Sequence, residues 1–526
     1  MHRTLSRRSL LKNLALATLA LPFPLSIQAQ PKVTKNPFAL GVASGSATHD
    51  SLVLWTRLHD EGLFSSNLPN AVIPVIWELA ADEGFTQMVQ SGVANAVPAL
   101  AHSVHVELSG LPSNQWFHYR FRINEFISPT GRTRTFATPG KSSAALRIAF
   151  ASCQNFELGY FNSYPHLVRE KPDLVLFLGD YIYEYPPGQK GVRNHSGSWC
   201  LSLEDYRARY AKYRQDVQLQ QLHACCPWLV TWDDHEVQND YAGLQAGSGG
   251  PYSDFAKRRA GAYQAFYEHM PLRASVLVDG LAGLEKGAEM RIYNSVRIGG
   301  LLSISLLDTR QYRAPQACTP GNKTGSGVID PGQCELLSSE GRSLLGTQQE
   351  QWLDTQLGNS KEQVWTLLAQ STLFGARVYR TGDGIRVWND GWDGYPAARR
   401  RLTDLLVKHQ LPNPVILGGD VHENWVGYVK EDYSSLNSRN IGVEFCGTSV
   451  SSYDGRNPDS ALRNNSHFVY AEGSRKGYGI MEVSSSELIV HLRAVKDHRT
   501  PESVIENLAS FRVVAGTQRL ERLAVS

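Results

Sequence analysis

Four short apolar runs in this 526-residue chain end alike, with a residue of a metal-binding type just after the last apolar position. The segments that follow the runs are Ser152-Cys153-Gln154, Gly179-Asp180-Tyr181-Ile182-Tyr183-Glu184, Asp233-Asp234-His235-Glu236 and Gly418-Gly419-Asp420-Val421-His422-Glu423. In open α/β sheets the carboxyl ends of the strands face the crevice in which ligands bind, so we expect these segments to converge. Carboxylates crowded together without a counter-charge repel one another, and bound cations best explain such an assembly.

The apolar runs predict largely buried strands, and segments with the 3.6-residue period of helices separate them. The expected strands are Leu146–Ala151, Leu174–Leu178, Trp228–Trp232, Leu301–Leu307, Val364–Leu368 and Pro414–Leu417. The expected helices are Glu204–His223, Asp254–Met270, Thr347–Leu357 and Ala397–His409. This alternation predicts an α/β core.

The segment before this core, residues 36–139, has a different pattern. Short β-branched and aromatic runs such as Leu52–Thr56, Val75–Leu79 and Trp116–Arg122 alternate with Gly, Pro, Ser and Asn. Such spacing predicts a small antiparallel β-sandwich, and we expect it to be non-catalytic because no acids and histidines gather in it. Pro139–Ser143 is the expected linker, and the chain length also favours two globular units.

The amino terminus resembles an export signal. Arg3, Arg7, Arg8 and Lys12 precede an apolar run, Leu14–Leu25, that is too short to span a bilayer comfortably. The paired arginines resemble a twin-arginine signal, so residues 1–29 predict a periplasmic or secreted bacterial protein that uses the twin-arginine export machinery. The alternative is a basic amphipathic helix that stays attached. We expect no stable transmembrane anchor.

The overall charge is nearly balanced. Lys and Arg number 52 against 50 Asp and Glu, so the balance gives no reason to expect a nucleic-acid scaffold role or binding to an anionic membrane surface. Partners must therefore be inferred from sites.

The cysteine count is seven, an odd number for an exported protein, so at least one thiol is unpaired or serves another purpose. Cys153 is the candidate for another purpose. Cys318 and Cys334 flank a loop rich in Pro and Gly, and we expect them to form a loop-closing disulfide. Cys225 and Cys226 are expected to be buried apolar residues.

Together with Phe38–Gly45 and Leu307–Arg313, the four strand-end segments resemble the PhoD-like alkaline phosphatase and phosphodiesterase family, a branch of the calcineurin-like metallophosphoesterases. The resemblance covers nearly the whole chain after the export signal. It implies a fibronectin-like sandwich over residues 36–139 and a metallophosphoesterase domain over residues 145–496, in which two β-sheets are flanked by helices (αββα). Residues 497–526 carry a helical pattern and are expected to form a tail that could act as a lid.

The resemblance also implies a set of metal ligands, namely Cys153, Asp180, Tyr183, Asp234, Asn239, Asp420 and His422. The thiolate, phenolate and imidazole donors would suit a ferric ion, because anionic sulfur and oxygen donors stabilise the trivalent state. Asp180 would bridge the metals. Asp234 and Asp420 would hold one or two calcium ions or another hard divalent metal. Asn239 would be a further oxygen ligand or a contact of the phosphate.

The implied activity is hydrolysis of small-molecule phosphate monoesters or diesters through a metal-activated water. Bound metals would polarise the phosphoryl oxygens, lower the pKa of the water and stabilise the in-line transition state, with Asp234 as part of the catalytic group. His235 would hydrogen-bond the phosphate or protonate the leaving alkoxide. Arg310 would add positive charge against the phosphoryl group, and a structural role for this arginine is the alternative.

Three other functions remain open from the sequence. The first is a phospholipase D-like phosphodiesterase of the same family. The second is a serine enzyme, because Asp459-Ser460-Ala461 resembles the nucleophile segment of zinc alkaline phosphatases, although no Gly-x-Ser-x-Gly motif supports other serine chemistry. The third is a secreted non-catalytic protein that binds metal or mediates adhesion.

Overall fold

The computed structural model describes residues 33–60, 68–189, 191–251, 254–284, 289–382, 384–435, 437–455 and 458–524. The predicted export signal, residues 1–29, lies outside these ranges. Within them, no helix has both the length and the apolar character needed to cross a membrane.

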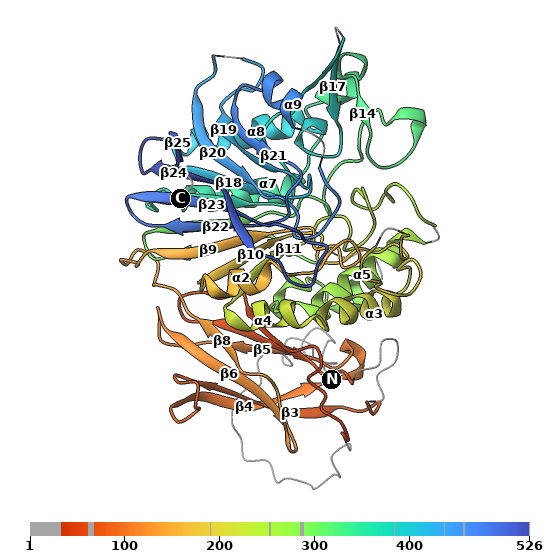
Figure 1. The fold of residues 1–526 in the computed structure, drawn as a ribbon, viewed down its shortest axis with the longest axis vertical. Coiled ribbons are helices and arrows are strands. Elements are labelled where there is room, and N and C mark those ends of the chain that lie inside the picture. The colour runs from red at the N-terminus through yellow and green to blue at the C-terminus, as the bar shows by residue number, and fades with distance from the viewer. Residues whose placement is uncertain are drawn as a thin grey trace, which may run out of the picture.

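The amino-terminal part folds as the predicted antiparallel β-sandwich, at the bottom of Figure 1. One layer contains β1 (Val42–Gly45), β2 (Leu52–Arg57) and β5 (Ser103–Leu108). The other layer contains β4 (Met88–Ala96), β3 (Ile73–Ala80), β6 (Trp116–Ile123), β7 (Phe126–Ile127) and β8 (Gly131–Arg134). Leu54, Val75 and Phe117 are fully buried in one apolar cluster, as expected for inward-facing positions of two packed sheets.

One layer of the sandwich is continuous with the sheet that follows it in the chain. Strand β1 pairs in parallel with β11 (Trp228–Thr231), with Gly45 opposite Trp228. A Cβ atom at Gly45 would lie 2.7 Å from the Trp228 carbonyl oxygen and 2.7 Å from Pro271 Cγ, so only glycine fits here. The two expected globular units therefore share one ten-stranded sheet.

Two large sheets form the rest of the molecule. Beyond β1, β2 and β5, the ten-stranded sheet contains β9 (Leu146–Ala151), β10 (Leu174–Leu178), β11, β22 (Gly477–Val483), β23 (Glu487–Val495), β24 (Ile505–Val514) and β25 (Leu520–Leu523). The seven-stranded sheet contains β12 (Asn294–Ile298), β13 (Leu302–Leu306), β15 (Trp365–Ala369), β18 (Pro414–Gly418), β20 (Asn440–Cys446), β19 (Asn424–Lys430) and β21 (Phe468–Glu472). Strands β9, β10 and β11 are parallel to one another, as are β13, β15, β18 and β20. A small third sheet contains β14 (Val328–Ile329), β17 (Gly384–Trp388) and β16 (Tyr379–Thr381).

The larger helices lie in two groups. On the side of the ten-stranded sheet are α2 (Tyr164–Arg169), α3 (Leu203–Arg214), α4 (Val217–Cys225) and α5 (Phe255–His269); toward the other end of the molecule are α7 (Thr347–Gly358), α8 (Pro396–Lys408) and α9 (Asp459–Asn464) (Figure 1). The short helix α6 (Leu281–Leu284) packs against α5. Short 3₁₀ turns occupy Pro98–Leu100, Ala274–Val276, Pro320–Asn322, Pro331–Gln333, Glu335–Ser338 and Trp392–Gly394.

Alternating side chains on the strands show how these layers are held together. In β18, Val415 and Leu417 belong to the largest apolar cluster, whereas Ile416 between them packs in the cluster that contains Leu402 and Leu406 of α8. In β10, Leu176 and Phe177 face opposite sides in the same way. Successive side chains of a strand point to opposite faces, so each sheet has one face toward the other sheet and one toward helices. The predicted αββα architecture is confirmed.

The six expected strands of this core are confirmed to within one residue at each end. The expected helix Glu204–His223 is two helices, α3 and α4, because Asp216 starts a new helix. Its carboxylate accepts hydrogen bonds from the backbone nitrogens of Gln218 and Leu219.

The prediction of a helical tail over residues 497–526 is wrong. Strands β24 and β25 form an antiparallel hairpin that extends the edge of the ten-stranded sheet beyond β23. Ala509, Phe511 and Val513 are buried at alternate positions, which is the two-residue period of a strand. Among the described residues, the carboxyl-terminal segment therefore forms part of the ten-stranded sheet and not a helical lid.

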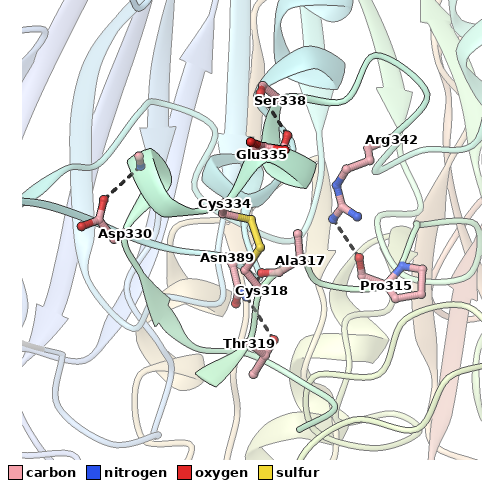
Figure 2. Close-up of a disulfide and its surroundings, with 11 residues drawn as sticks. Pro315, Ala317, Cys318, Thr319, Asp330, Cys334, Glu335, Ser338, Arg342 and Asn389 are labelled. Atoms are coloured by element: carbon pink, nitrogen blue, oxygen red, sulfur yellow. Dashed lines mark hydrogen bonds between the residues drawn. A yellow bond between two sulfur atoms is a disulfide. The ribbon is translucent and has the colours of Figure 1, made fainter. Parts of the chain in front are cut away.

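The predicted disulfide between Cys318 and Cys334 is confirmed (Figure 2). Around it, Asn389 Nδ2 donates to the carbonyl oxygen of Ala317 at 2.8 Å and to Thr319 Oγ1 at 3.1 Å. Among the other cysteines of the described residues, Cys226 is fully buried as expected, whereas Cys225 is only partly buried.

We expect the double substitution Cys318→Ser, Cys334→Ser to lower the free energy of unfolding by about 3 kcal/mol, because it releases a loop closed over 16 residues. Chemical denaturation followed by fluorescence measures this change. Cys225→Ser, at an unpaired thiol, is the matched control and should unfold close to the wild type. A double variant with the wild-type denaturation midpoint would contradict the expectation.

Candidate metal centre

The four strand-end segments meet at the carboxyl ends of parallel strands from both large sheets. Cys153 follows β9, Asp180 follows β10, Asp234 follows β11, and Asp420 and His422 follow β18. The ligand atoms of Cys153, Asp180 and His422 all lie within 4.8 Å of one another. The same holds for Asp180, Asp234 and His235. Asp180 belongs to both groups, so its carboxylate links them.

The backbone at this rim is strained. Cys153, Asp180, Asp420 and His422 have φ angles of 59°, 57°, 64° and 59°, in the left-handed region that residues with a side chain rarely adopt. Each such residue costs about 1–3 kcal/mol and persists where the surrounding structure enforces it, which is common at functional sites. Gly179 has a φ of 101°, and a Cβ there would lie 2.5 Å from that of Asp233. The turns thus bring the ligand-type side chains together at the expense of local stability.

The inner part of the site disfavours negative charge on Asp180 and on Cys153. Cys153, Asp180, Tyr183 and Asp234 are each at most 4 % exposed. Burial raises the pKa of Asp180 well above its usual value, and Asp234 adds to this effect. Burial and the neighbouring Asp180 also raise the pKa of the Cys153 thiol. Asp180 Oδ1 is buried without a hydrogen-bond partner among the described residues, so the cluster fits a bound cation that would supply both charge and contact.

The other donors also suit a metal. Tyr183 Oη lies 3.1 Å from Asp180 Oδ2 and 3.1 Å from Ser452 Oγ. Burial, with the nearby Lys476 and His235, lowers the pKa of His422 to about 3, so its imidazole is in the neutral form that ligation requires. Asp420 lies at the partly exposed side of the rim, where Thr372 Oγ1 donates to its Oδ2 at 2.7 Å. Sulfur, oxygen and nitrogen donors are therefore present in one place.

A third acidic group extends the site and was not predicted from the sequence. Ligand oxygens of Asp234, Asp240 and Asp390 lie within 4.8 Å of one another, and the backbone nitrogen of Asp240 donates to Asp234 Oδ2 at 2.7 Å. Burial raises the pKa of Asp240 to about 6, with contributions from Asp390 and Asp234. Asp240 follows no strand directly, and Asp390 follows β17, a strand that is mostly only partly buried, so neither acid comes after a buried apolar run.

Arg310 has a different place from the one predicted. Its guanidinium is 1 % exposed and lies 2.5 Å from Asp233, 2.8 Å from Asp390 and 3.5 Å from Asp234. Burial alone would raise the pKa of Asp234, but Arg310 and His235 outweigh burial and keep it below its usual value. Arg310 thus neutralises the buried acids, which is the structural role that the sequence left as the alternative, and it has no exposed face for a phosphate.

His235 lies at the partly exposed side of the site and is held by a buried carboxylate. Its Nδ1 is 2.7 Å from Oε2 of Glu184, which is fully buried. The second oxygen of Glu184 accepts from the backbone nitrogen of Asn239 at 2.8 Å. Burial lowers the pKa of His235, but Glu184, Asp234 and Asp180 outweigh burial and raise it well above the usual value. The imidazole can therefore carry a proton. The side chain of Asn239 donates to Ser248 Oγ at 2.8 Å.

Comparison with known proteins gives one consistent result. The family model described as PhoD-like phosphatase matches residues 148–492, and the one described as PhoD-like phosphatase, N-terminal domain, matches residues 25–137. The chain is 41 % identical to alkaline phosphatase D of Bacillus subtilis (strain 168) over 495 residues, which cover 92 % of this chain and 82 % of that protein. A solved structure of PhoD superposes with a TM-score of 0.88 at 40 % identity and covers 94 % of each chain.

Proposed function

Because this chain belongs to the PhoD-like phosphatase family, and is thus a hydrolase of phosphoric ester bonds, we propose that the cluster around Asp180 is its active site. The observation that carries the proposal is the convergence of Cys153, Asp180, Asp234 and His422, with ligand atoms that lie within 4.8 Å of one another in two groups sharing Asp180. The substrates are phosphate monoesters, diesters or both. A phospholipase D-like diesterase is the narrower alternative within the same family.

The donor chemistry supports two kinds of metal. Cys153, Tyr183 and His422 would hold a ferric ion together with Asp180, because sulfur and phenolate donors favour iron in its trivalent state. Asp234 and Asp420, with Asp180 and Asn239, offer the oxygen donors that calcium or another hard divalent ion prefers. When bound, such ions supply Lewis acidity to the phosphoryl oxygens and a nucleophile from water at neutral pH.

His235 is the residue that we assign to proton transfer. It is partly exposed, beside the buried acids, and its raised pKa keeps a proton on the ring. With Nδ1 fixed by Glu184 at 2.7 Å, the proton on Nε2 is available to the phosphate or to the leaving oxygen. Asp233 accepts from Ser371 Oγ and from Arg310, and this buried network positions Asp234 next to it. In this proposal Arg310 is a positioning residue.

The remaining alternatives have less support. Ser460 is exposed at the start of α9, which packs on β16 and β21, and Ser460 belongs to none of the clusters described above.

Export is also part of the proposal: the arginine pair and short apolar run in residues 1–29 favour passage through the twin-arginine machinery to the periplasm or the medium.

Hydrolysis of 4-nitrophenyl phosphate and bis(4-nitrophenyl) phosphate by the purified protein tests the proposal. We expect turnover of at least one ester, a fall of at least about 100-fold after calcium chelation, and recovery when calcium is returned. The control variant Ser460→Ala should keep wild-type activity. Turnover that ignores chelation and is lost in Ser460→Ala would favour the serine enzyme instead, and no turnover with iron and calcium present would contradict the active-site assignment.

A further inference from the structure

Four aromatic rings form a row that begins at the candidate site, and we call this row the wall. Starting at the metal-ligand position, the ring of Tyr183 lies 4.2 Å from that of His235, and the ring of Tyr185 lies 5.6 Å from each of these two. Trp199 extends the row, 6.5 Å from Tyr185 in an edge-to-face arrangement. Tyr185 and Trp199 are partly exposed, so the wall leads from the buried ligand Tyr183 to solvent.

A buried arginine holds the backbone that carries this wall. Arg209 of α3 is 4 % exposed, and its guanidinium donates to the backbone carbonyls of Tyr183 and Tyr185 and, on the other side, to that of Ser198 at 3.0 Å. Tyr185 and Trp199 lie near opposite ends of the connection between β10 and α3, and Arg209 thus holds both parts of this connection. Asn155 Nδ2 donates to Tyr185 Oη at 2.5 Å and fixes this ring as well. A Cβ at Gly250 would lie 3.0 Å from the Trp199 ring, so the neighbouring loop packs closely on the indole.

The chemistry of the wall is that of flat apolar faces. The charged groups beside it are already engaged: Arg209 with backbone carbonyls and Glu184 with His235. Aromatic faces prefer to pack against another aromatic ring, in stacked or edge-to-face geometry.

We propose that Tyr185 and Trp199 determine specificity as a subsite for an aromatic leaving group, because they continue the row of rings past His235, the proton donor to the leaving oxygen. This inference rests on the proposed function. It predicts that the enzyme hydrolyses phosphate esters with an aromatic ring near the ester oxygen with a higher kcat/KM than esters of small alkyl alcohols.

Benzyl phosphate and ethyl phosphate test this subsite, with their methyl diesters as substitutes if the enzyme accepts only diesters. The two leaving alcohols have similar acidity and differ in the ring, and release of inorganic or methyl phosphate gives kcat/KM. We expect Trp199→Ala to lower kcat/KM about tenfold for the benzyl ester and less than about twofold for the ethyl ester. Trp199→Phe should restore most of the benzyl activity. Trp116→Ala, in the amino-terminal sandwich, is the control and should leave kcat/KM unchanged for both esters.

The possible outcomes separate the two claims. Hydrolysis of both esters with equal losses in Trp199→Ala would overturn the subsite and leave the hydrolase assignment intact. A benzyl preference that persists in both Trp199→Ala and Tyr185→Leu would overturn it too. No hydrolysis of any ester by the metal-loaded wild type would instead contradict the proposed function on which the subsite depends.

Discussion

Replacement of Asp180 by Asn is expected to lower kcat at least about 1000-fold. The carboxylate of Asp180 belongs to both ligand groups, with Cys153 and His422 on one side and Asp234 and His235 on the other. A neutral amide would remove the one carboxylate that both proposed metal positions would share, and metal stabilisation of transferring phosphoryl groups is worth several kcal/mol. Steady-state kinetics and metal content measure the loss. Asp404→Asn, at an exposed position of α8, is the matched control.

The same variant should show that its defect is not a folding defect. Burial raises the folded-state pKa of Asp180 above its unfolded value, so ionisation of this group destabilises the metal-free fold increasingly as pH rises from the unfolded to the folded pKa. Asn avoids this cost. At neutral pH the metal-free variant is expected to melt at or above the temperature of the metal-free wild type, whereas added metal should raise the Tm of the wild type alone. A variant that melts well below the metal-free wild type would point to structural damage.

Replacement of Glu184 by Gln is expected to lower kcat about 100-fold for esters with a poor leaving group. Glu184 is fully buried and fixes His235 through Nδ1, so its loss frees the ring and removes the charge that keeps the ring protonated. The effect should depend on the leaving group. An alkoxide needs a proton as it departs, but 4-nitrophenolate departs without one, so ethyl phosphate should suffer much more than 4-nitrophenyl phosphate.

This dependence on the leaving group distinguishes proton donation from simple positioning. Equal losses for both esters in Glu184→Gln would mean that Glu184 supports the site only structurally, through its bond to the Asn239 backbone. Glu204→Gln, at an exposed glutamate in the first turn of α3, provides the control for loss of one carboxylate and should leave both rates unchanged.

The sequence alone predicts the site residues that lie just after buried strands. Asp180, Asp234 and Asp420 follow buried apolar runs, and the carboxyl ends of parallel strands share an edge of their sheet, so the convergence could be predicted from the sequence alone. Asp240 and Asp390 lie in loops whose paths depend on tertiary contacts, such as the bonds from Ser248 and Ser326 to Asp240. Nothing local in the sequence distinguishes them from surface acids.

Two other differences have physical causes of the same kind. Arg310 follows β13 closely, as a ligand would. Its guanidinium lies among the buried acids because it pairs with Asp233 and Asp390, which are far from it in the chain. The sequence predicts a helix where the structure has the carboxyl-terminal strands, because short apolar segments such as Ala509–Val513 fit the period of a helix as well as that of a strand. Their pairing with β23 decides between the two, and pairing is a tertiary property.

Anomalous X-ray diffraction from crystals of the purified, active protein locates its metals. We expect an iron signal between Cys153, Asp180 and His422 and a lighter ion beside Asp180 and Asp234. If crystals of protein that hydrolyses phosphate esters show no metal at these residues, or show it elsewhere, the cluster around Asp180 is not the metal centre.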